Sequence, residues 1–175
     1  MIRKATLNDI TQVEDCFVEL LEYEQTHGAY TSWRLNIYPT RKTAEKGVEE
    51  GNLYVLEQNG DISACMIASQ TQPAKFNDIE WRYPARADEV FVINLLCVRP
   101  SKARCGVGKS MVQYIIEEAK HMNCKAVRLD TGIQNLPAVE LYTKLGFELA
   151  GNNNYYLFYE LNLPIVLNSD NTFKP

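Results

Sequence analysis

The apolar residues change their spacing several times along the chain, and each spacing predicts a different element. A short strand at 2–5 is followed by apolar positions that recur every three or four residues, a pattern typical of an amphipathic helix that ends near Gly28. The stripe of this helix consists of Ile10, Val13, Phe17, Leu20, Leu21 and Tyr23. Residues 29–40 then form a loop rich in aromatic side chains, and a second helix ends near Gly51.

Two predicted strands follow, over 52–58 and 62–70. The Asn59-Gly60 pair between them favours the tight turn of a β-hairpin. Residues 71–88 contain clusters of turn-forming residues. Segment 89–98 is the most hydrophobic of the chain, and such a continuous apolar run predicts a central strand that is buried on both faces.

The second half of the chain alternates between helices and strands. A Gly-rich segment precedes a predicted helix with the apolar stripe Val107, Met111, Ile115, Ala119 and Met122. A strand at 125–131, a helix at 135–145 and an antiparallel strand pair at 147–150 and 155–161 come next. We expect one domain over 1–161 and a polar C-terminal tail over 162–175.

Composition narrows the class of protein. The chain has 175 residues, enough for about one domain, and its 46% hydrophobic and 23% charged residues are ordinary globular usage. The net charge of −4 argues against general binding to nucleic acid or to an anionic membrane. The five cysteines are scattered and include no C-x-x-C pair, so we expect neither a disulfide framework nor a metal site. The first residues lack the apolar core of a secretory signal, and no apolar run has the length of a bilayer-spanning helix, so a cytoplasmic protein is expected.

The strand, loop and helix around residue 106 carry the clearest local chemistry. Gly106 and Gly108 allow the backbone to turn sharply and to approach a ligand closely. The free N–H groups and the positive dipole end of the following helix would point at the same place, and Arg104 and Lys109 add positive charge. Such an arrangement binds phosphate groups with few side chains.

Three interpretations of this loop are compatible with its residues. The stretch from Ala103 to Ser110 matches the nucleotide-binding pattern G-x-x-x-x-G-K-[ST] except at Ala103. That loop usually follows the first strand of its domain, however, and here Asp130 would have to hold the Mg²⁺ ion. The second interpretation is the pyrophosphate loop of an acetyl-CoA enzyme, and the third is a Gly-rich turn that binds nothing.

Two motifs resemble the signatures of the GNAT superfamily of acetyl-CoA-dependent N-acetyltransferases. The segment Asn135–Phe147 follows the pattern N-x-x-A-x-x-L-Y-x-x-x-G-F. The segment Val98–Gly108 follows V-x-P-x-x-[QR]-x-x-G-x-G, except that Ala103 replaces the Gln or Arg and an Arg comes one position later, at Arg104. The motifs stand in the family's order with a predicted strand between them, and the resemblance extends over 1–161.

The resemblance implies an α+β fold of three layers, in which a mixed, mostly antiparallel sheet of about seven strands is flanked by about four helices. It also implies transfer of an acetyl group from acetyl-CoA to a primary amine of a small molecule or peptide, by direct attack in a ternary complex and without a metal. A non-catalytic acyl-CoA-binding module on the same fold is the alternative. A homodimer is compatible with the resemblance, because dimers are common in this family.

The resemblance assigns further roles position by position. The end of the central strand would pair with the pantetheine arm, and the loop would hold the pyrophosphate. Tyr142 would act as the general acid that protonates the leaving thiolate, and Asn135 would contact the cofactor or cap its helix. The cofactor-binding positions are Leu96, Cys97, Val98, Ala103, Arg104, Cys105, Gly106, Val107, Gly108, Lys109, Ser110, Asn135, Ala138 and Tyr142.

The general base does not follow from the motifs. Many relatives place a carboxylate near the positions of Asn94 and Leu95, and neither of these residues takes a proton. Glu89, acting through water from the start of the strand, and Asp130 are the candidate bases. A solvated or structural carboxylate is the alternative interpretation of each.

The acceptor pocket is predicted from aromatic and acidic residues outside the motifs. Its candidate lining residues are Trp33, Tyr38, Trp81 and Asp130, and core packing is the alternative interpretation of the aromatic ones. The first helix also carries Glu19, Glu22 and Glu24, which either attract a cationic amine or form an ordinary solvated face.

Overall fold

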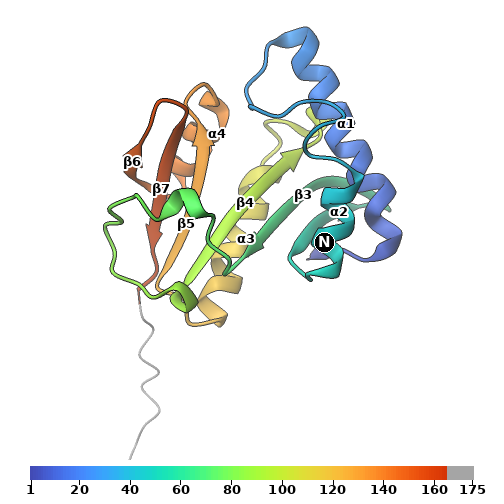
Figure 1. Ribbon diagram of the computed structural model, residues 1–175. Coiled ribbons are helices and arrows are strands. Elements are labelled where there is room, and N and C mark those ends of the chain that lie inside the picture. Colours follow the sequence, from blue (N-terminus) through green and yellow to red (C-terminus); the bar gives the residue numbers. More distant parts are fainter. Residues whose placement is uncertain (165–175) are drawn as a thin grey trace, which may run out of the picture.

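The sheet consists of seven strands that pair in the order β1-β2-β3-β4-β5-β7-β6. The computed structural model describes residues 1–164, and Figure 1 shows the strands as one open, twisted sheet. The strands are β1 (Ile2–Lys4), β2 (Leu53–Gln58), β3 (Asp61–Ser69), β4 (Val90–Val98), β5 (Ala126–Gly132), β6 (Glu148–Asn152) and β7 (Tyr156–Asn162). Neighbouring strands are antiparallel except β4 and β5, which run parallel. The predicted mixed, mostly antiparallel sheet is therefore confirmed.

Helices cover both faces of the sheet (Figure 1). Over the described part of the chain they are α1 (Ile10–His27), α2 (Arg41–Glu49), α3 (Val107–His121) and α4 (Leu136–Lys144). Side chains of a strand alternate between the two faces, so in β2 Leu53 and Val55 pack in the core under α1, while Tyr54 and Leu56 pack in the core under α3. This double coverage explains why the central strand is apolar almost throughout, and it confirms the predicted three-layer α+β architecture.

The sheet splits between β4 and β5. Their pairing covers only four positions, from Val90 opposite Ala126 to Ile93 opposite Leu129. A register shift between β3 and β4 leaves Asn94 without a partner on β3, and β4 then continues beside β3 alone. Figure 1 shows the two parallel strands diverging beyond this point, so that one edge of β4 is open toward the gap.

The C-terminal boundary lies slightly beyond the predicted one. β7 extends to Asn162, which pairs with Ala126, and the next residue donates its N–H to the Lys125 carbonyl at 2.8 Å. The side chain of that residue, Leu163, is only 3% exposed and belongs to the main core. The first residues of the predicted tail are therefore part of the domain, and residues 165–175 of that tail lie outside the described residues. Within residues 1–164 no helix combines the length and the apolar character needed to cross a bilayer.

A buried ion pair fixes the long connection between β3 and β4. Arg128 on β5 and Glu160 on β7 are cross-strand partners, with Nε and Oε1 2.8 Å apart and side-chain exposures of 6% and 0%. Glu160 accepts the N–H of Tyr83 at 3.1 Å, and Arg128 donates to the Tyr83 carbonyl at 3.2 Å. The Arg128 guanidinium also lies 4.4 Å from the centre of the Trp81 ring. Trp81 thus packs in this anchor, as its alternative interpretation predicts. Within residues 1–164 it does not line the cavity described below, so its predicted place in the acceptor pocket is wrong.

A second charged cluster ties β1 to the start of α1. Arg3 donates to both carboxylate oxygens of Asp9, at 2.8 and 2.9 Å, and to Glu57 at 2.7 Å. These bonds from Arg3 lower the pKa of Asp9 to about 2, against the effect of burial and with help from Thr6. The folded state therefore favours the ionised carboxylate, so its stabilisation is complete above the ordinary pKa of 3.8 and is lost as the pH falls toward 2.

Replacing Asp9 by Asn is expected to lower the free energy of unfolding by about 1–2 kcal/mol at neutral pH, because the bidentate pair with Arg3 is lost. The difference from the wild type should shrink as the pH falls from about 4 to about 2. Denaturant titrations at several pH values measure this dependence, with the exposed Glu49 replaced by Gln as the control. A difference that is independent of pH would contradict the assignment.

Candidate active site

The loop between β4 and α3 exposes the N-terminus of a helix. After a short 3-10 turn at Pro100–Lys102, Arg104 and Gly106 both take left-handed backbone conformations, with φ of 60° and 79°. The N–H of Ser110 donates to the Gly106 carbonyl at 2.9 Å, so the amides of Val107–Lys109 come before the first bond of the helical ladder. A Cβ atom built on Gly106 would meet no atom of residues 1–164 within 4 Å, which leaves this side of the loop open. Free amides, a helix dipole and two exposed cations, Arg104 and Lys109, give this loop the features of an anion-binding site.

Gly108 joins this loop to the split in the sheet. A Cβ atom at this position would lie 3.5 Å from Leu141 on α4 and 3.6 and 3.9 Å from Val98 and Leu96 on β4. The glycine thus lets the first turn of α3 approach both elements closely. Leu96 also lines the cavity described next, so the loop and the cavity lie next to each other at the end of β4.

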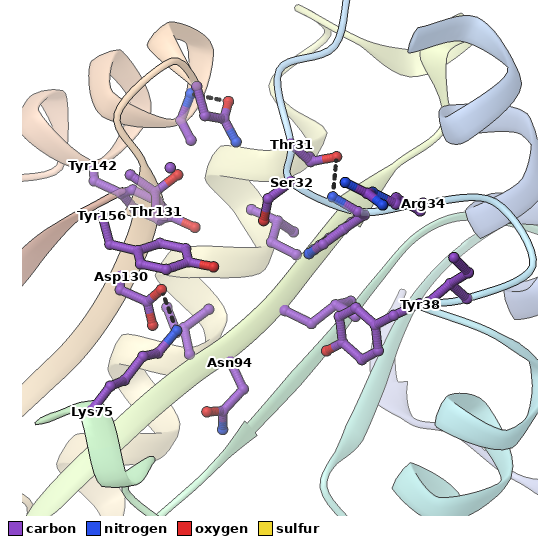
Figure 2. A pocket seen from close by; sticks show the side chains of 18 residues that line it. Thr31, Ser32, Arg34, Tyr38, Lys75, Asn94, Asp130, Thr131, Tyr142 and Tyr156 are labelled. Atoms are coloured by element: carbon purple, nitrogen blue, oxygen red, sulfur yellow. Dashed lines mark hydrogen bonds and ion pairs between the residues drawn. The ribbon is translucent and has the colours of Figure 1, made fainter. Parts of the chain in front are cut away.

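A cavity of about 330 Å³ lies at the open end of the split. Figure 2 shows its walls: β5, α4 and the turn before β4 (Ala74–Phe76, in the long connection from β3) on one side, and the loop after α1 on the other. The lining residues from β4 and beyond are Ile93, Asn94, Leu95, Leu96, Asp130, Thr131, Gly132, Asn135, Ala138, Tyr142 and Tyr156. Those from the loop after α1 and from the turn before β4 are Thr31, Ser32, Trp33, Arg34, Ile37, Tyr38 and Lys75.

Asp130 is the one carboxylate that lines this cavity within residues 1–164. Its side chain is 13% exposed, and its Oδ2 atom accepts from Lys75 Nζ at 2.6 Å. The same ammonium lies 4.4 Å from the centre of the Tyr156 ring, an arrangement in which the ring face and the carboxylate both hold the cation. Figure 2 shows the pair at the wall formed by β5 and the turn before β4.

Tyr142 projects from α4 into the same cavity. Its side chain is 5% exposed, and its ring packs edge-on against Phe147 with ring centres 5.6 Å apart. Burial, and to a lesser degree the charge of Asp130, raises the pKa of Tyr142 well above its ordinary value. The phenol therefore stays protonated at neutral and mildly alkaline pH, as a proton donor must.

The helix that carries Tyr142 is capped by a residue of the same motif. The Asn135 side chain accepts the N–H of Ala138 at 3.3 Å, so the prediction that Asn135 caps its helix is confirmed. Asn135 and Ala138 also line the cavity, which makes the predicted contact with a ligand geometrically available.

The loop after α1 closes the cavity from the opposite side. Glu24 is only 4% exposed and accepts the N–H groups of Tyr30 and Thr31, at 3.3 and 3.1 Å, and the Thr31 hydroxyl at 2.7 Å. The Tyr30 carbonyl lies 3.9 Å from the Cβ position of Gly132 at the end of β5, so the loop reaches across the split. Neither sequence interpretation of Glu24 was right: the residue anchors the loop and is neither solvated nor free to attract an amine.

The structure separates the predicted site residues into groups. Leu96, Asn135, Ala138, Tyr142, Trp33, Tyr38 and Asp130 line the cavity. The loop and the first turn of α3 contain Ala103, Arg104, Cys105, Gly106, Val107, Gly108, Lys109 and Ser110. Val98 is half-buried beside Gly108, and the side chain of Cys97 points into the core under α1, so only its backbone is available to a ligand.

Glu89 is not brought to the cavity. It precedes β4 at the end where β4 and β5 are still paired, and Lys125 Nζ contacts its carboxylate at 2.9 Å. The carboxylate also accepts the Arg86 N–H at 3.0 Å, and this bond, followed by that of Lys125, lowers the pKa of Glu89. With these partners the Glu89 carboxylate caps the short helix before β4, so the prediction that it reaches the site as a base is wrong.

The lining residues that the sequence interpretation did not predict include Arg34, Lys75 and Tyr156. The first two lie in irregular segments without periodicity, and Tyr156 begins the last strand. The turn residues of 71–88 and the aromatic residues of 29–40 predict that these segments are loops. They do not indicate which of their residues face the cavity. Within residues 1–164, no group of three or more His, Cys, Asp or Glu side chains is placed to hold a metal ion.

Comparisons with known proteins agree with this geometry. The model of the acetyltransferase (GNAT) family matches residues 13–147. An uncharacterised N-acetyltransferase of Methanocaldococcus jannaschii is 28% identical over 159 residues, which cover 85% of this chain and 62% of that protein. This chain thus corresponds to less than two thirds of the length of that relative.

Solved structures share the fold. A GNAT-family acetyltransferase of Streptococcus agalactiae superimposes with a TM-score of 0.81 at 18% identity, covering 94% of this chain and 95% of that one. An acetyltransferase from Salmonella typhimurium, determined with its cofactor acetyl-CoA, gives a TM-score of 0.66 at 17% identity, with 94% of each chain covered. With its split sheet, its loop and its matched motifs, the chain belongs to the GNAT family of acetyltransferases.

Proposed function

We propose that the protein transfers the acetyl group of acetyl-CoA to the primary amine of a small molecule or peptide, by direct attack in a ternary complex. One observation carries the proposal: a loop with the features of an anion-binding site and a tyrosine-containing cavity lie next to each other at a split between two parallel strands. The family membership and the acetyl-CoA bound to the Salmonella relative support the same cofactor here.

The residues at the loop fit the charged end of acetyl-CoA. The open side of Gly106 and the free amides of the first turn of α3 are complementary to a pyrophosphate, and Arg104 and Lys109 supply positive charge beside it. Beyond Ile93, one edge of β4 has no partner strand within residues 1–164, so its backbone groups at Leu96–Val98 are available to the amides of a pantetheine arm. The cofactor supplies an activated acetyl thioester.

The residues of the cavity then act on the reacting groups. Backbone N–H groups at the bulge and open edge of β4 stabilise the charge that develops on the acetyl carbonyl oxygen. Tyr142 donates its proton to the leaving thiolate. Asp130 binds the acceptor near its amine, since Lys75 contacts only Oδ2 and leaves Oδ1 for a second donor. The amine attacks in its neutral form and loses one proton as the amide forms, and this proton restores, through the solvent, the one that Tyr142 donates. Holding both substrates in one cavity provides much of the acceleration.

Replacing Gly106 by Val is expected to raise the dissociation constant of acetyl-CoA by about tenfold or more, because valine is strained at a φ of +79° and its methyl groups enter the open side of the loop. Isothermal titration calorimetry measures the constant. Gly60→Val is the matched control, since Gly60 in the β2–β3 hairpin has a φ of +86° and equally open surroundings. Unchanged affinity in a folded Gly106 variant would overturn the loop assignment.

The alternative, a non-catalytic acyl-CoA-binding module, is favoured by the exposed amide of Asn94 at the β4 bulge, which cannot act as a base for the amine. The two functions differ in turnover and not in cofactor binding. An assay of free thiol released from acetyl-CoA, run with and without a panel of amines, separates them. Release that depends on the amine supports the transferase, and cofactor binding without such release supports the module.

A further inference from the structure

Building on the proposed function, we infer that the acceptor carries a carboxylate besides its amine, and that Arg34 binds this carboxylate. The substrate class is then a small amino acid-like molecule, in contrast to a polyamine or a simple alkylamine. The inference depends on the charges that face the cavity, on how Arg34 is held and on the position of Arg34 relative to Asp130 and Tyr142.

The charges of the cavity leave one cation without a partner. Among the described lining residues, the charged side chains are Arg34, Lys75 and Asp130. Lys75 and Asp130 form an ion pair at 2.6 Å, so their charges offset each other. Arg34 is exposed to the cavity and makes no ion pair or side-chain hydrogen bond within residues 1–164. A chain with a net charge of −4 thus places an excess positive charge in its candidate acceptor site.

The backbone at Arg34 is firmly held. The N–H of Arg34 donates to the Tyr38 carbonyl at 2.9 Å, and the Arg34 carbonyl accepts the N–H groups of Tyr38 and Ile37, each at 3.0 Å. Asn36 has a φ of 63°, which closes this turn tightly. Glu24 anchors the chain just before the turn, as described above. A guanidinium on such a fixed turn loses less conformational entropy when it binds a ligand than one on a free loop.

Arg34 lies on the opposite wall from the Asp130–Lys75 pair. Figure 2 shows Asp130, Lys75, Tyr142 and Tyr156 on one side of the cavity and Arg34 with Thr31 and Ser32 on the other. An acceptor whose amine lies near Asp130 and Tyr142 therefore extends its remaining atoms toward Arg34. A guanidinium binds a carboxylate through two parallel hydrogen bonds, whereas a second ammonium group on the acceptor would be repelled there.

The size of the cavity limits the acceptor. Its volume of about 330 Å³ corresponds to the space of roughly ten water molecules, and the acetyl end of the cofactor takes part of it. A single amino acid fits in the remaining volume. If the acceptor were a folded protein, only one of its side chains could enter the cavity. The carboxylate that Arg34 binds thus belongs to the same small molecule as the amine.

The test compares acceptors that differ only in the carboxylate. Each L-amino acid is assayed beside its carboxamide and its decarboxylated amine, with spermidine as a polyamine probe. For the amino acids that are acetylated, kcat/KM should exceed that of the carboxamide and the amine by about ten- to a hundredfold, the effect of one charged hydrogen-bonded pair. The N-acetylated product is quantified by mass spectrometry.

Two substitutions then attribute the preference to Arg34. Arg34→Gln is expected to raise KM for the amino acid about tenfold or more, to leave the carboxamide nearly unaffected and to leave acetyl-CoA affinity unchanged. Arg34→Lys should retain part of the preference for the amino acid. The control Lys42→Gln, which removes an exposed cation on α2, should change KM for neither the amino acid nor the carboxamide.

The outcomes distinguish this inference from the function on which it rests. Equal acetylation of acid, carboxamide and amine by the wild type, or an equal loss for all three in Arg34→Gln, overturns the carboxylate site and leaves the acetyltransferase intact. Efficient acetylation of spermidine in place of amino acids does the same. If no amine of the panel is acetylated although acetyl-CoA binds, both the inference and the proposed transfer are wrong.

Discussion

Replacing Tyr142 by Phe is expected to lower kcat by about a hundredfold or more while leaving the dissociation constant of acetyl-CoA unchanged. The change removes only the hydroxyl that donates a proton to the leaving thiolate, and a well-placed general acid contributes a factor of about 10² to 10⁴. The phenyl ring keeps its packing against Phe147, so the fold should persist. Steady-state kinetics with a saturating acceptor, together with calorimetry, measure the two quantities.

The control for this variant is Tyr159→Phe. Tyr159 on β7 is 6% exposed and belongs to the same core as Tyr142, but it does not line the cavity within the described residues. Its variant should retain the wild-type kcat. An unchanged kcat in Tyr142→Phe, or an equal loss in both variants, would remove the acid role from Tyr142.

The pH profile tests the protonation state of the same residue. Because the pKa of Tyr142 is raised, the phenol keeps its proton through the range in which an acceptor amine becomes neutral. The rate of the wild type should therefore rise with pH as the amine deprotonates, without a fall near the ordinary tyrosine pKa of 10. A fall near pH 10 that is absent from the Phe variant would contradict the raised pKa.

Replacing Glu160 by Ala is expected to lower the free energy of unfolding by about 3 kcal/mol or more. Glu160 is fully buried, and its removal leaves the guanidinium of Arg128 without its charge partner and the Tyr83 N–H without its acceptor. The segment 70–89, which carries Lys75 into the cavity, then loses its anchor. Chemical denaturation of the purified variants measures the loss.

A double variant separates the charge effect from a general loss of packing. In Arg128→Met with Glu160→Leu, both charges are absent and apolar volume fills the site, so much of the lost stability should return. A Glu160→Ala variant within about 1 kcal/mol of the wild type would show that the pair is not a structural anchor. The same conclusion would follow if the double variant lost as much free energy of unfolding as its two single substitutions lose together.

Much of the fold could be predicted from the sequence, because the relevant signals are local. The three- and four-residue spacing after Ile10 and after Val107, and the apolar run that ends at Val98, each reflect which side chains one element buries. The loop at Gly106 and the helix that carries Tyr142 could also be predicted from their motifs. A left-handed glycine at a helix start and a capped helix both depend on residues only a few positions apart.

The acceptor side of the site could not be predicted in the same way. Arg34 and Lys75 reach the cavity because distant carboxylates anchor their segments, and such partners leave no periodic signal. Glu24 lies on a helix with many acids, and nothing in the spacing shows that it is buried against backbone amides. Trp81 was equally compatible with a pocket and with packing, and its contact with Arg128 decided between them.

The most direct test of the account is the fate of the acetyl group itself. The full chain is incubated with acetyl-CoA that carries a deuterated acetyl group and with the panel of amino acids and amines. We predict that the labelled acetyl group appears on the nitrogen of an acceptor in a one-to-one ratio with free CoA thiol, and that Tyr142→Phe slows both in parallel. If the chain binds acetyl-CoA but produces neither labelled amide nor thiol above the uncatalysed rate, the proposed acetyltransferase function is contradicted.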